Sequence, residues 1–130
     1  MLFSFYDDED DSSVELDYGT EADYSPVDYQ KMLRNADDIM GDGVKVVGTV
    51  LQIENNKYSN SYCLVEMNGD VDQLVLVRIE DKYYPKNKII KGDHVTICGI
   101  LSGTKEYETV LGDENEVPYV DACIKVRNSQ

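Results

Sequence analysis

Residues 44–53, Val44-Lys45-Val46-Val47-Gly48-Thr49-Val50-Leu51-Gln52-Ile53, carry the pattern that decides the fold. Their period is two, which predicts a β-strand. The central glycine predicts that this strand bends, because a residue without a side chain relieves crowding where a sheet coils or bulges. One face of the strand should carry Val44, Val46, Gly48, Val50 and Gln52, and the intervening residues should share the other face.

Further short strands are expected after this stretch. Asn68-Gly69-Asp70 is a tight-turn signal, whereas residues 80–93 are polar and contain Pro85, which favours a connector. A body built of short strands can remove its exposed edges by closing into a barrel, so the sequence predicts a mainly β fold. The expected strands are residues 61–67, 73–79, 94–101 and 117–126, with a shorter alternating segment at 106–111.

One short helix is expected ahead of the first strand. Ser25 suits the N-cap and Pro26 suits the first helical position. Asp28 would then lie in the first turn, where the helix dipole favours a negative charge. We expect the helix to end between residues 35 and 38, before a turn at 39–43. The apolar residues at helical spacing are Tyr29, Met32, Leu33 and Ala36.

Negative charge is concentrated at the start of the chain. Residues 1–30 hold ten acids and no Lys or Arg, whereas the remaining 100 residues hold the other 16 acids and all 12 bases. A charge-dense segment cannot bury enough apolar surface to offset its ordering entropy. We therefore divide the chain into an acidic N-terminal arm, residues 1–24, and a helix plus barrel, residues 25–130. A net charge of −14 argues against direct binding of nucleic acid and favours a basic protein partner.

The cysteines and the first residues indicate a reducing compartment. Cys63, Cys98 and Cys123 each lie in an apolar run without CxxC spacing, so we expect buried thiols; one disulfide with a spare thiol is the alternative. The chain start lacks the basic region of a signal peptide, and no run approaches the ~20 apolar residues of a membrane span. The expected location is the cytoplasm of a host cell, unless a leader was removed before residue 1.

No motif in the sequence predicts an enzyme. His94 is the only histidine and the cysteines are not clustered, so a zinc site lacks its usual ligands, and we expect His94 to be a structural or surface residue. The sequence has no GxSxG, no GxGxxG and no phosphate-binding loop. Its acidic clusters lack the spacing of a calcium-binding EF-hand. We therefore expect a non-enzymatic protein with no cofactor and no metal.

Several short motifs follow one another in an order that resembles a known family. Over residues 27–126 the chain resembles the small bacterial and phage OB-fold proteins of the tRNA-anti-like group. The resemblance implies a five-stranded OB-fold-like Greek-key barrel and no particular reaction. Many such relatives look like secreted lipoproteins, and this chain departs from them by its acidic arm. The motifs are Tyr29…Leu33-x-Asn35, Val44-x-Val46-x-Gly48-x-Val50, Asn68-Gly69-Asp70, Gly92-Asp93-x-Val95-Thr96-Ile97-x-Gly99, Tyr107-Glu108-Thr109-Val110-Leu111-Gly112 and Pro118 before the last strand.

The composition is similar in kind to that of phage-encoded DNA mimics, including anti-CRISPR proteins. RNA-guided nucleases hold nucleic acid in positively charged channels, which would attract an anionic protein. Tyrosines among the acids can supply flat contact area, although the same rings could instead pin the arm to the barrel. The predicted partner-binding residues are Asp7, Asp8, Glu9, Asp10, Asp11, Glu15, Asp17, Tyr18, Glu21, Asp23, Tyr24, Asp113, Glu114 and Glu116.

The favoured hypothesis is an inhibitor that occupies the basic nucleic-acid-binding cleft of a nuclease, for example a CRISPR effector nuclease. The inhibitor itself is expected to bind neither nucleic acid nor membrane. The first alternative is an OB-fold protein-interaction module of an envelope or regulatory assembly. The second is a nucleic-acid binder that uses the lysines of the connector, Lys82, Lys86, Lys88 and Lys91.

Overall fold

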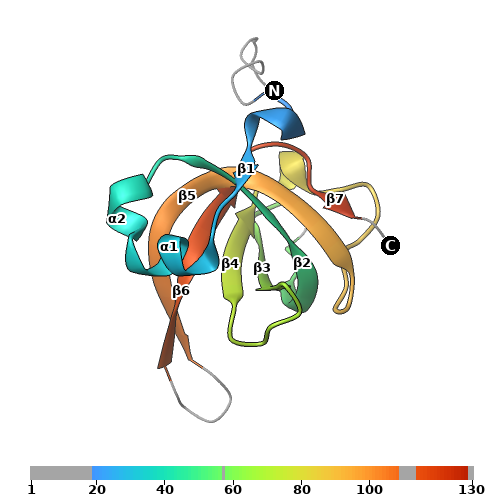
Figure 1. Cartoon of the computed structure of the whole chain (residues 1–130). Coiled ribbons are helices and arrows are strands. Elements are labelled where there is room, and N and C mark those ends of the chain that lie inside the picture. Colours follow the sequence, from blue (N-terminus) through green and yellow to red (C-terminus); the bar gives the residue numbers. More distant parts are fainter. Residues whose placement is uncertain (1–18, 57, 109–113, 129–130) are drawn as a thin grey trace.

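The long strand predicted from the alternating valines is β2, Gly43–Glu54. In the computed structural model, which describes residues 19–56, 58–108 and 114–128, β2 pairs along both of its edges. Its first half is antiparallel to β5 and its second half is antiparallel to β3, and Gly48 and Thr49 pair with both partners. Strand β2 therefore joins the two ends of the sheet (Figure 1).

Five strands form the closed barrel, which confirms the predicted mainly β fold. Around the barrel β2 is followed by β3, β4, β6 and β5, and β5 returns to β2. Only β4 and β6 are parallel neighbours within this ring. Two short strands extend the sheet, β1 beside β2 and β7 beside β5. The bounds are β1 Ser25–Pro26, β3 Ser61–Met67, β4 Leu74–Ile79, β5 His94–Glu108, β6 Glu114–Ala122 and β7 Arg127–Asn128.

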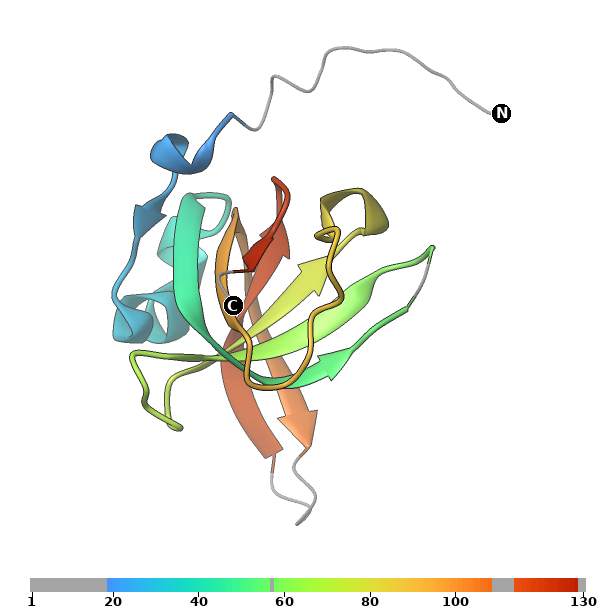
Figure 2. The same cartoon turned by 90° about the vertical axis from the view of Figure 1, so that its right-hand side faces the viewer.

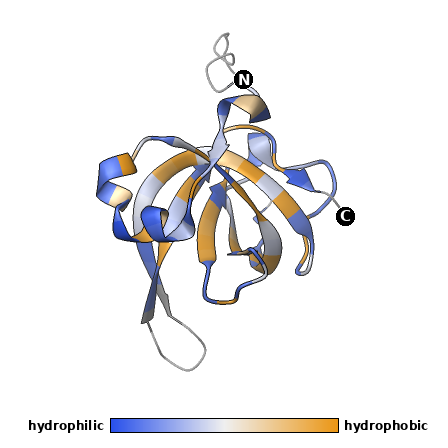
Figure 3. Cartoon of the chain, viewed as in Figure 1, coloured by the Kyte–Doolittle hydropathy of each residue, from blue (hydrophilic) through white to orange (hydrophobic). Residues whose placement is uncertain are grey.

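Branched apolar side chains fill the barrel, and hydrophobic residues are concentrated on its strands (Figure 3). Met32 from the helical segment and Ile89 from the connector belong to the same core and are both fully buried. The helices lie on one side of the barrel and the connector lies on the other (Figure 2). Barrel residues with no exposed area include Val44, Val46, Val65, Val75, Val77, Ile79, Val95, Ile97, Leu101 and Val120.

Gly48 lies where β2 bends between its two partners. A Cβ built on Gly48 would be only 2.2 Å from the backbone oxygen of Glu66 on β3, so no larger residue fits without moving the backbone. A bulge between Val50 and Gln52 then shifts the register. Gln52 consequently points outward and Ile53 packs against the core. The prediction that Gln52 shares the face of the buried valines is therefore wrong, because a bulge reverses the alternation.

The helix begins later than predicted. Ser25–Pro26 is not its first turn but β1, which pairs in parallel with β2. The helix α1 is Tyr29–Arg34, and its N-cap is Asp28, whose carboxylate accepts a hydrogen bond from the backbone N–H of Lys31 at 3.3 Å. A second helix, α2, Ala36–Ile39, follows and takes up the start of the predicted turn. Ser25 fails as the cap because the sheet uses its backbone.

The second half of the barrel contains fewer breaks than predicted. The segment expected at 94–101 and the first part of the one expected at 106–111 belong to one strand, β5, which continues through a register shift between Leu101 and Thr104; residues 109–111 lie outside the described residues. Gly103, with a φ of 94°, supplies the irregular backbone at this shift. The expected last strand ends at Ala122 instead of residue 126, and β7 follows separately. Asn68 and Gly69 both have positive φ, which confirms the predicted tight turn.

The three cysteines are buried and free, as expected from their apolar surroundings. Burial raises the pKa of Cys63 to about 12, so this thiol stays protonated at neutral pH. Cys98 and Cys123 lie outside the main core, in a smaller cluster with Tyr24. Among the described residues, no helix is long and apolar enough to cross a membrane.

Gly48→Ala should lower the free energy of unfolding by about 2 kcal/mol, the usual cost of forcing extra volume into a packed site. Val47→Ala is the matched control, because Val47 is the neighbouring residue on β2 and is 40% exposed. Urea denaturation followed by circular dichroism measures both changes. Equal losses in the two variants would show that β2 is not tightly packed at residue 48.

Candidate protein-binding surface

The described part of the predicted arm is attached to the barrel. Residues Glu21–Asp23 form a short 3-10 helix, and Tyr24 follows with only 7% of its surface exposed. The Tyr24 ring packs against Cys98 and Cys123, and its burial raises the pKa of the phenol to about 12. For this tyrosine the contacts favour the alternative that the ring pins the chain to the barrel.

Glu21 is also held by the protein's own side chains. Arg127 donates from Nε to Glu21 Oε2 at 2.8 Å and from Nη2 to Oε1 at 3.1 Å. Lys45 Nζ lies 3.7 Å from the same carboxylate. The hydrogen bond from Arg127 holds the pKa of Glu21 below its usual value. Asp23 accepts a hydrogen bond from the backbone N–H of Thr20 at 2.8 Å, so both acids have intramolecular partners.

The other predicted partner-binding residues fall into two groups. Glu116 lies on β6 and is exposed, and Glu114 begins the same strand, although its side chain is not among those described. The rest lie outside the described residues: Asp7, Asp8, Glu9, Asp10, Asp11, Glu15, Asp17, Tyr18 and Asp113.

Glu116 lies between two adjoining hollows beside α1, which we call the acidic groove. One hollow, of about 170 Å³, is lined by Asp72 from the β3–β4 loop, and the other, of about 500 Å³, is lined by Asp37 from α2. Leu33 and Glu116 line both hollows. The acidic groove thus brings together carboxylates from three separate segments of the chain.

The carboxylates of the acidic groove are not neutralised by nearby bases. Within the described part of the chain, Asp37, Asp72 and Glu116 form no ion pair. Glu116 accepts a hydrogen bond from Thr104 Oγ1 at 2.6 Å, a neutral donor. Arg34 also lines the groove and carries one positive charge against the three carboxylates; its Nε donates to the neutral Gln30 on its own helix at 2.7 Å. The groove therefore presents exposed negative charge.

Apolar surface lies beside these charges. Val71, which lines the same hollow as Asp72, is 65% exposed, and Leu33 is half-buried between the two hollows. Protein interfaces commonly combine an apolar contact with a charged rim. The acidic groove has both components and can therefore bind a basic protein surface.

The lysines of the connector lie away from the acidic groove. The connector runs from the short 3-10 helix Asp81–Tyr83 to β5, and it lies on the side of the barrel opposite the helices (Figure 2). Lys82 Nζ is 3.9 Å from Glu80 and 5.2 Å from the ring centroid of Tyr83. The exposed lysines of this segment are Lys82, Lys86, Lys88 and Lys91. The acidic groove and the connector lysines therefore lie on different sides of the molecule.

A second, smaller apolar area lies on the outside of β3 and β4. Its partly exposed residues are Leu51 and Leu76, which pack against a buried cluster of Leu64, Leu74 and Val117. A shallow hollow of about 230 Å³ continues this surface toward Tyr62 and Glu54.

Sequence reasoning found Glu116 but missed its neighbours. Asp37 falls within the predicted helix end, and neither Asp37 nor Asp72 is among the predicted partner-binding residues. Their common position depends on α1 packing beside the β3–β4 loop and β6, and no local pattern encodes that arrangement. Across the described residues, no group of three His, Cys, Asp or Glu side chains could hold a metal ion.

Comparison with models of known protein families and with characterised proteins finds no match for this chain. The resemblance to small OB-fold proteins of the tRNA-anti-like group therefore stays a prediction.

Tyr24→Phe should remove a phenol that ionises well above the ordinary range of tyrosine. Because burial raises its pKa from 10.0 to about 12, the neutral ring stabilises the fold fully below pH 10, and this contribution is lost as the pH rises toward 12. Spectrophotometric titration of tyrosine measures the effect. Tyr58→Phe, at a residue that is 81% exposed, is the control and should leave the component that ionises near pH 12 in place. If Tyr24→Phe instead removes a tyrosine that ionises near pH 10, the Tyr24 ring is not buried.

Proposed function

We propose that this protein is a non-enzymatic acidic inhibitor, phage-encoded and anti-CRISPR-like. It occupies the basic nucleic-acid-binding cleft of a nuclease in the host cytoplasm by mimicking the charge of nucleic acid. The observation that carries the proposal is the acidic groove, where Asp37, Asp72 and Glu116 have no cationic partner among the described residues. A basic cleft would supply the missing cations.

Charge segregation supports this mode of binding. Association between oppositely charged surfaces is steered by their long-range field, and the molecule's net charge is −14. The connector lysines lie on the other side of the barrel, so the groove can approach the cleft while those lysines point away from it. The acids of residues 1–18 add seven carboxylates and no base to the same field.

The apolar residues of the acidic groove give the complex a contact that salt does not screen. Ionic contacts at an exposed surface weaken as ionic strength rises, whereas burial of apolar area does not. Val71 and Leu33 supply apolar area beside the carboxylates. In this mechanism the carboxylates orient the inhibitor in the cleft, and the apolar contact slows its release.

The scaffold for this activity is an OB-fold-like Greek-key barrel. Three features support this proposal: β2, β3 and β4 follow one another as antiparallel neighbours, the long connector 80–93 comes next, and β5 returns to pair with β2. Such an arrangement of four strands defines a Greek key. A closed barrel holds its loops in fixed positions, which suits a surface built from several separate segments.

Neutralising the acidic groove should weaken inhibition. We expect about tenfold weaker binding to a guide-loaded Cas9-type nuclease for the variant Asp37→Asn/Asp72→Asn/Glu116→Gln. The free energies of three exposed ionic contacts, each modest, together correspond to about that change in Kd. The variant should also show a smaller dependence on salt. Competition with labelled target DNA, measured by fluorescence anisotropy at two salt concentrations, tests both expectations.

The control variant removes the same charge from another face. Glu54→Gln/Glu66→Gln/Glu80→Gln changes three carboxylates on β2, on β3 and after β4. It should bind almost as well as the unmodified chain. A wild-type protein that fails to compete with DNA would contradict the proposed nuclease target, and equal affinity of the groove variant would contradict the role of the groove.

The apolar outer face favours a second candidate function, an OB-fold protein-interaction module. Its leucines and Tyr62 could bind a partner of an envelope or regulatory assembly without any mimicry of charge. The two functions differ in their need for the N-terminal acids.

Deleting residues 2–18 separates the two functions. Because Tyr24 and Glu21 hold the remaining segment on the barrel, the deletion should leave the thermal unfolding temperature nearly unchanged. Removal of the seven carboxylates should weaken binding to the nuclease and lower its salt dependence. Affinity and salt dependence that stay as in the full chain would favour the interaction module instead.

A further inference from the structure

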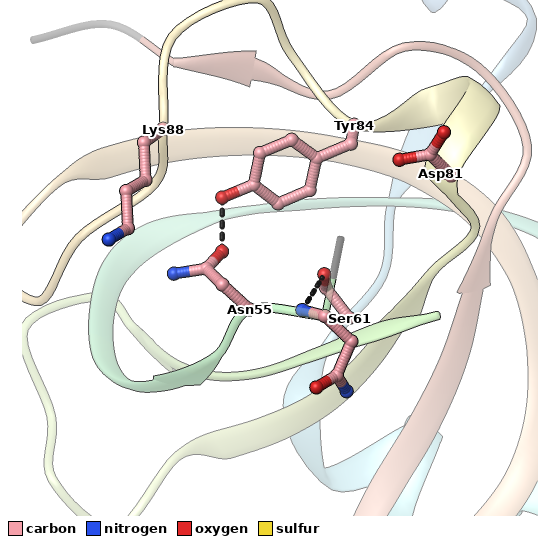
Figure 4. Close-up of a pocket in the computed structure, with 6 residues that line it drawn as sticks. Asn55, Ser61, Asp81, Tyr84 and Lys88 are labelled. Carbon is pink, nitrogen blue, oxygen red and sulfur yellow. Dashed lines mark hydrogen bonds between the residues drawn. The ribbon is translucent and has the colours of Figure 1, made fainter. Parts of the chain in front are cut away.

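A polar cavity at the other side of the barrel has no part in the proposed inhibition. It lies between the β2–β3 loop and the connector and has a volume of about 360 Å³ (Figure 4). Small-molecule sites in proteins commonly begin at about 300 Å³. The lining residues are Asn55, Asn56, Ser61, Asp81, Tyr84 and Lys88.

One wall of the cavity is fixed by hydrogen bonds between the two segments. The Tyr84 hydroxyl donates to Asn55 Oδ1 and accepts from the backbone N–H of Ile89 at 2.9 Å. Asn55 Nδ2 in turn donates to the backbone oxygen of Ile89 at 3.1 Å. Ile89 is fully buried in the barrel core. The Tyr84 ring is therefore held in position before any ligand arrives, which lowers the entropy cost of binding.

The floor of the cavity offers polar groups that still have bonding capacity. Ser61 is only 2% exposed, and its Oγ accepts a hydrogen bond from the backbone N–H of Asn56 at 3.0 Å. Among the described contacts the Ser61 hydroxyl has no acceptor for its own hydrogen. Asn56 uses its Nδ2 on the backbone oxygen of Asn60 at 2.9 Å, which leaves its Oδ1 as an acceptor. These groups match the N–H and C=O groups of a peptide bond.

The two charged residues of the cavity lie on either side of the Tyr84 ring (Figure 4). Lys88 and Asp81 form no ion pair with each other or with another described residue. A complementary ligand carries a carboxylate for Lys88 and an ammonium group for Asp81. Because the Tyr84 ring lies between Lys88 and Asp81, those two charges must be separated along the ligand, as they are at the two ends of an extended short peptide.

We infer that this cavity binds a short free peptide in extended form. Its terminal carboxylate pairs with Lys88, its terminal ammonium group pairs with Asp81, and its backbone contacts Asn56 and Ser61 beside the Tyr84 ring. A nucleotide fits less well, because Asp81 repels its phosphate and the ligand has no matching cation.

Titration of the full chain with trialanine tests the inference. Protein NMR should show saturable shifts of the amides of Asn56, Ser61 and Lys88, with a Kd of about 1 mM or tighter. N-acetyl-trialanine and trialanine amide, each lacking one terminal charge, should bind about tenfold more weakly, since each removes a charge-assisted hydrogen bond.

Variants of Lys88 and Asp81 test which residue binds which end of the peptide. In Lys88→Met, amidation of the carboxyl end should have no further effect, whereas acetylation of the amino end should still weaken binding. In Asp81→Asn the pattern should be reversed. Lys86→Met is the matched control, because Lys86 is an exposed lysine of the same connector that does not line the cavity; it should bind like the unmodified chain.

Three outcomes would overturn the inference. They are the absence of saturable shifts at about 10 mM trialanine, equal affinity for the blocked and unblocked peptides, and tighter binding of adenosine monophosphate than of trialanine. Because the cavity variants leave Asp37, Asp72 and Glu116 intact, their inhibition of a nuclease reports separately on the proposed function.

Discussion

The double pairing of β2 is the constraint on which the rest of the structure depends. A strand that pairs with β5 along its first half and with β3 along its second must bend, and both partners approach it at Gly48 and Thr49. The backbone oxygen of Glu66 leaves no room for a Cβ at residue 48. Closing the sheet in this way removes its open edges and creates one interior, where valines from each of the five barrel strands are buried. Each loop of the barrel is positioned by this closure.

Closure also explains how two charged surfaces can exist on a small protein without cancelling each other. Helix α1 packs beside the β3–β4 loop and β6, and this packing groups Asp37, Asp72 and Glu116 around Leu33. The connector crosses the other side and carries the lysines with it (Figure 2). The buried Met32 and Ile89 anchor these two segments in the same core. A rigid interior thus keeps the opposite charges apart, although a flexible chain of the same composition would let them pair.

The sequence predicted the features that depend on local patterns. The bend at Gly48, the strand at residues 61–67 and the turn at Asn68-Gly69 all follow from alternation and from backbone conformations that few residues adopt. The errors arose where tertiary contacts override local preference. Ser25 has the chemistry of a helix cap, but it pairs with β2 instead, and Asp28 takes the cap. Gln52 points outward because pairing with β3 introduces a bulge that reverses the alternation of β2.

The candidate site was harder to predict than the fold, because charge density along a chain does not reveal which charges are already paired. Glu21 and Tyr24 looked like contacts for a partner, yet Glu21 binds Arg127 and Lys45, and Tyr24 is buried against two cysteines. These pairs have a consequence for the acids that precede them in the sequence. Arg127 and Lys45 both pair with Glu21 near that end of the described chain, and its single carboxylate offsets one of their two positive charges. The barrel therefore offers less cationic surface there to compete with an external partner for the carboxylates of residues 1–18. The intramolecular ion pairs of Glu21 thus leave the acids that precede it better suited to bind an external partner.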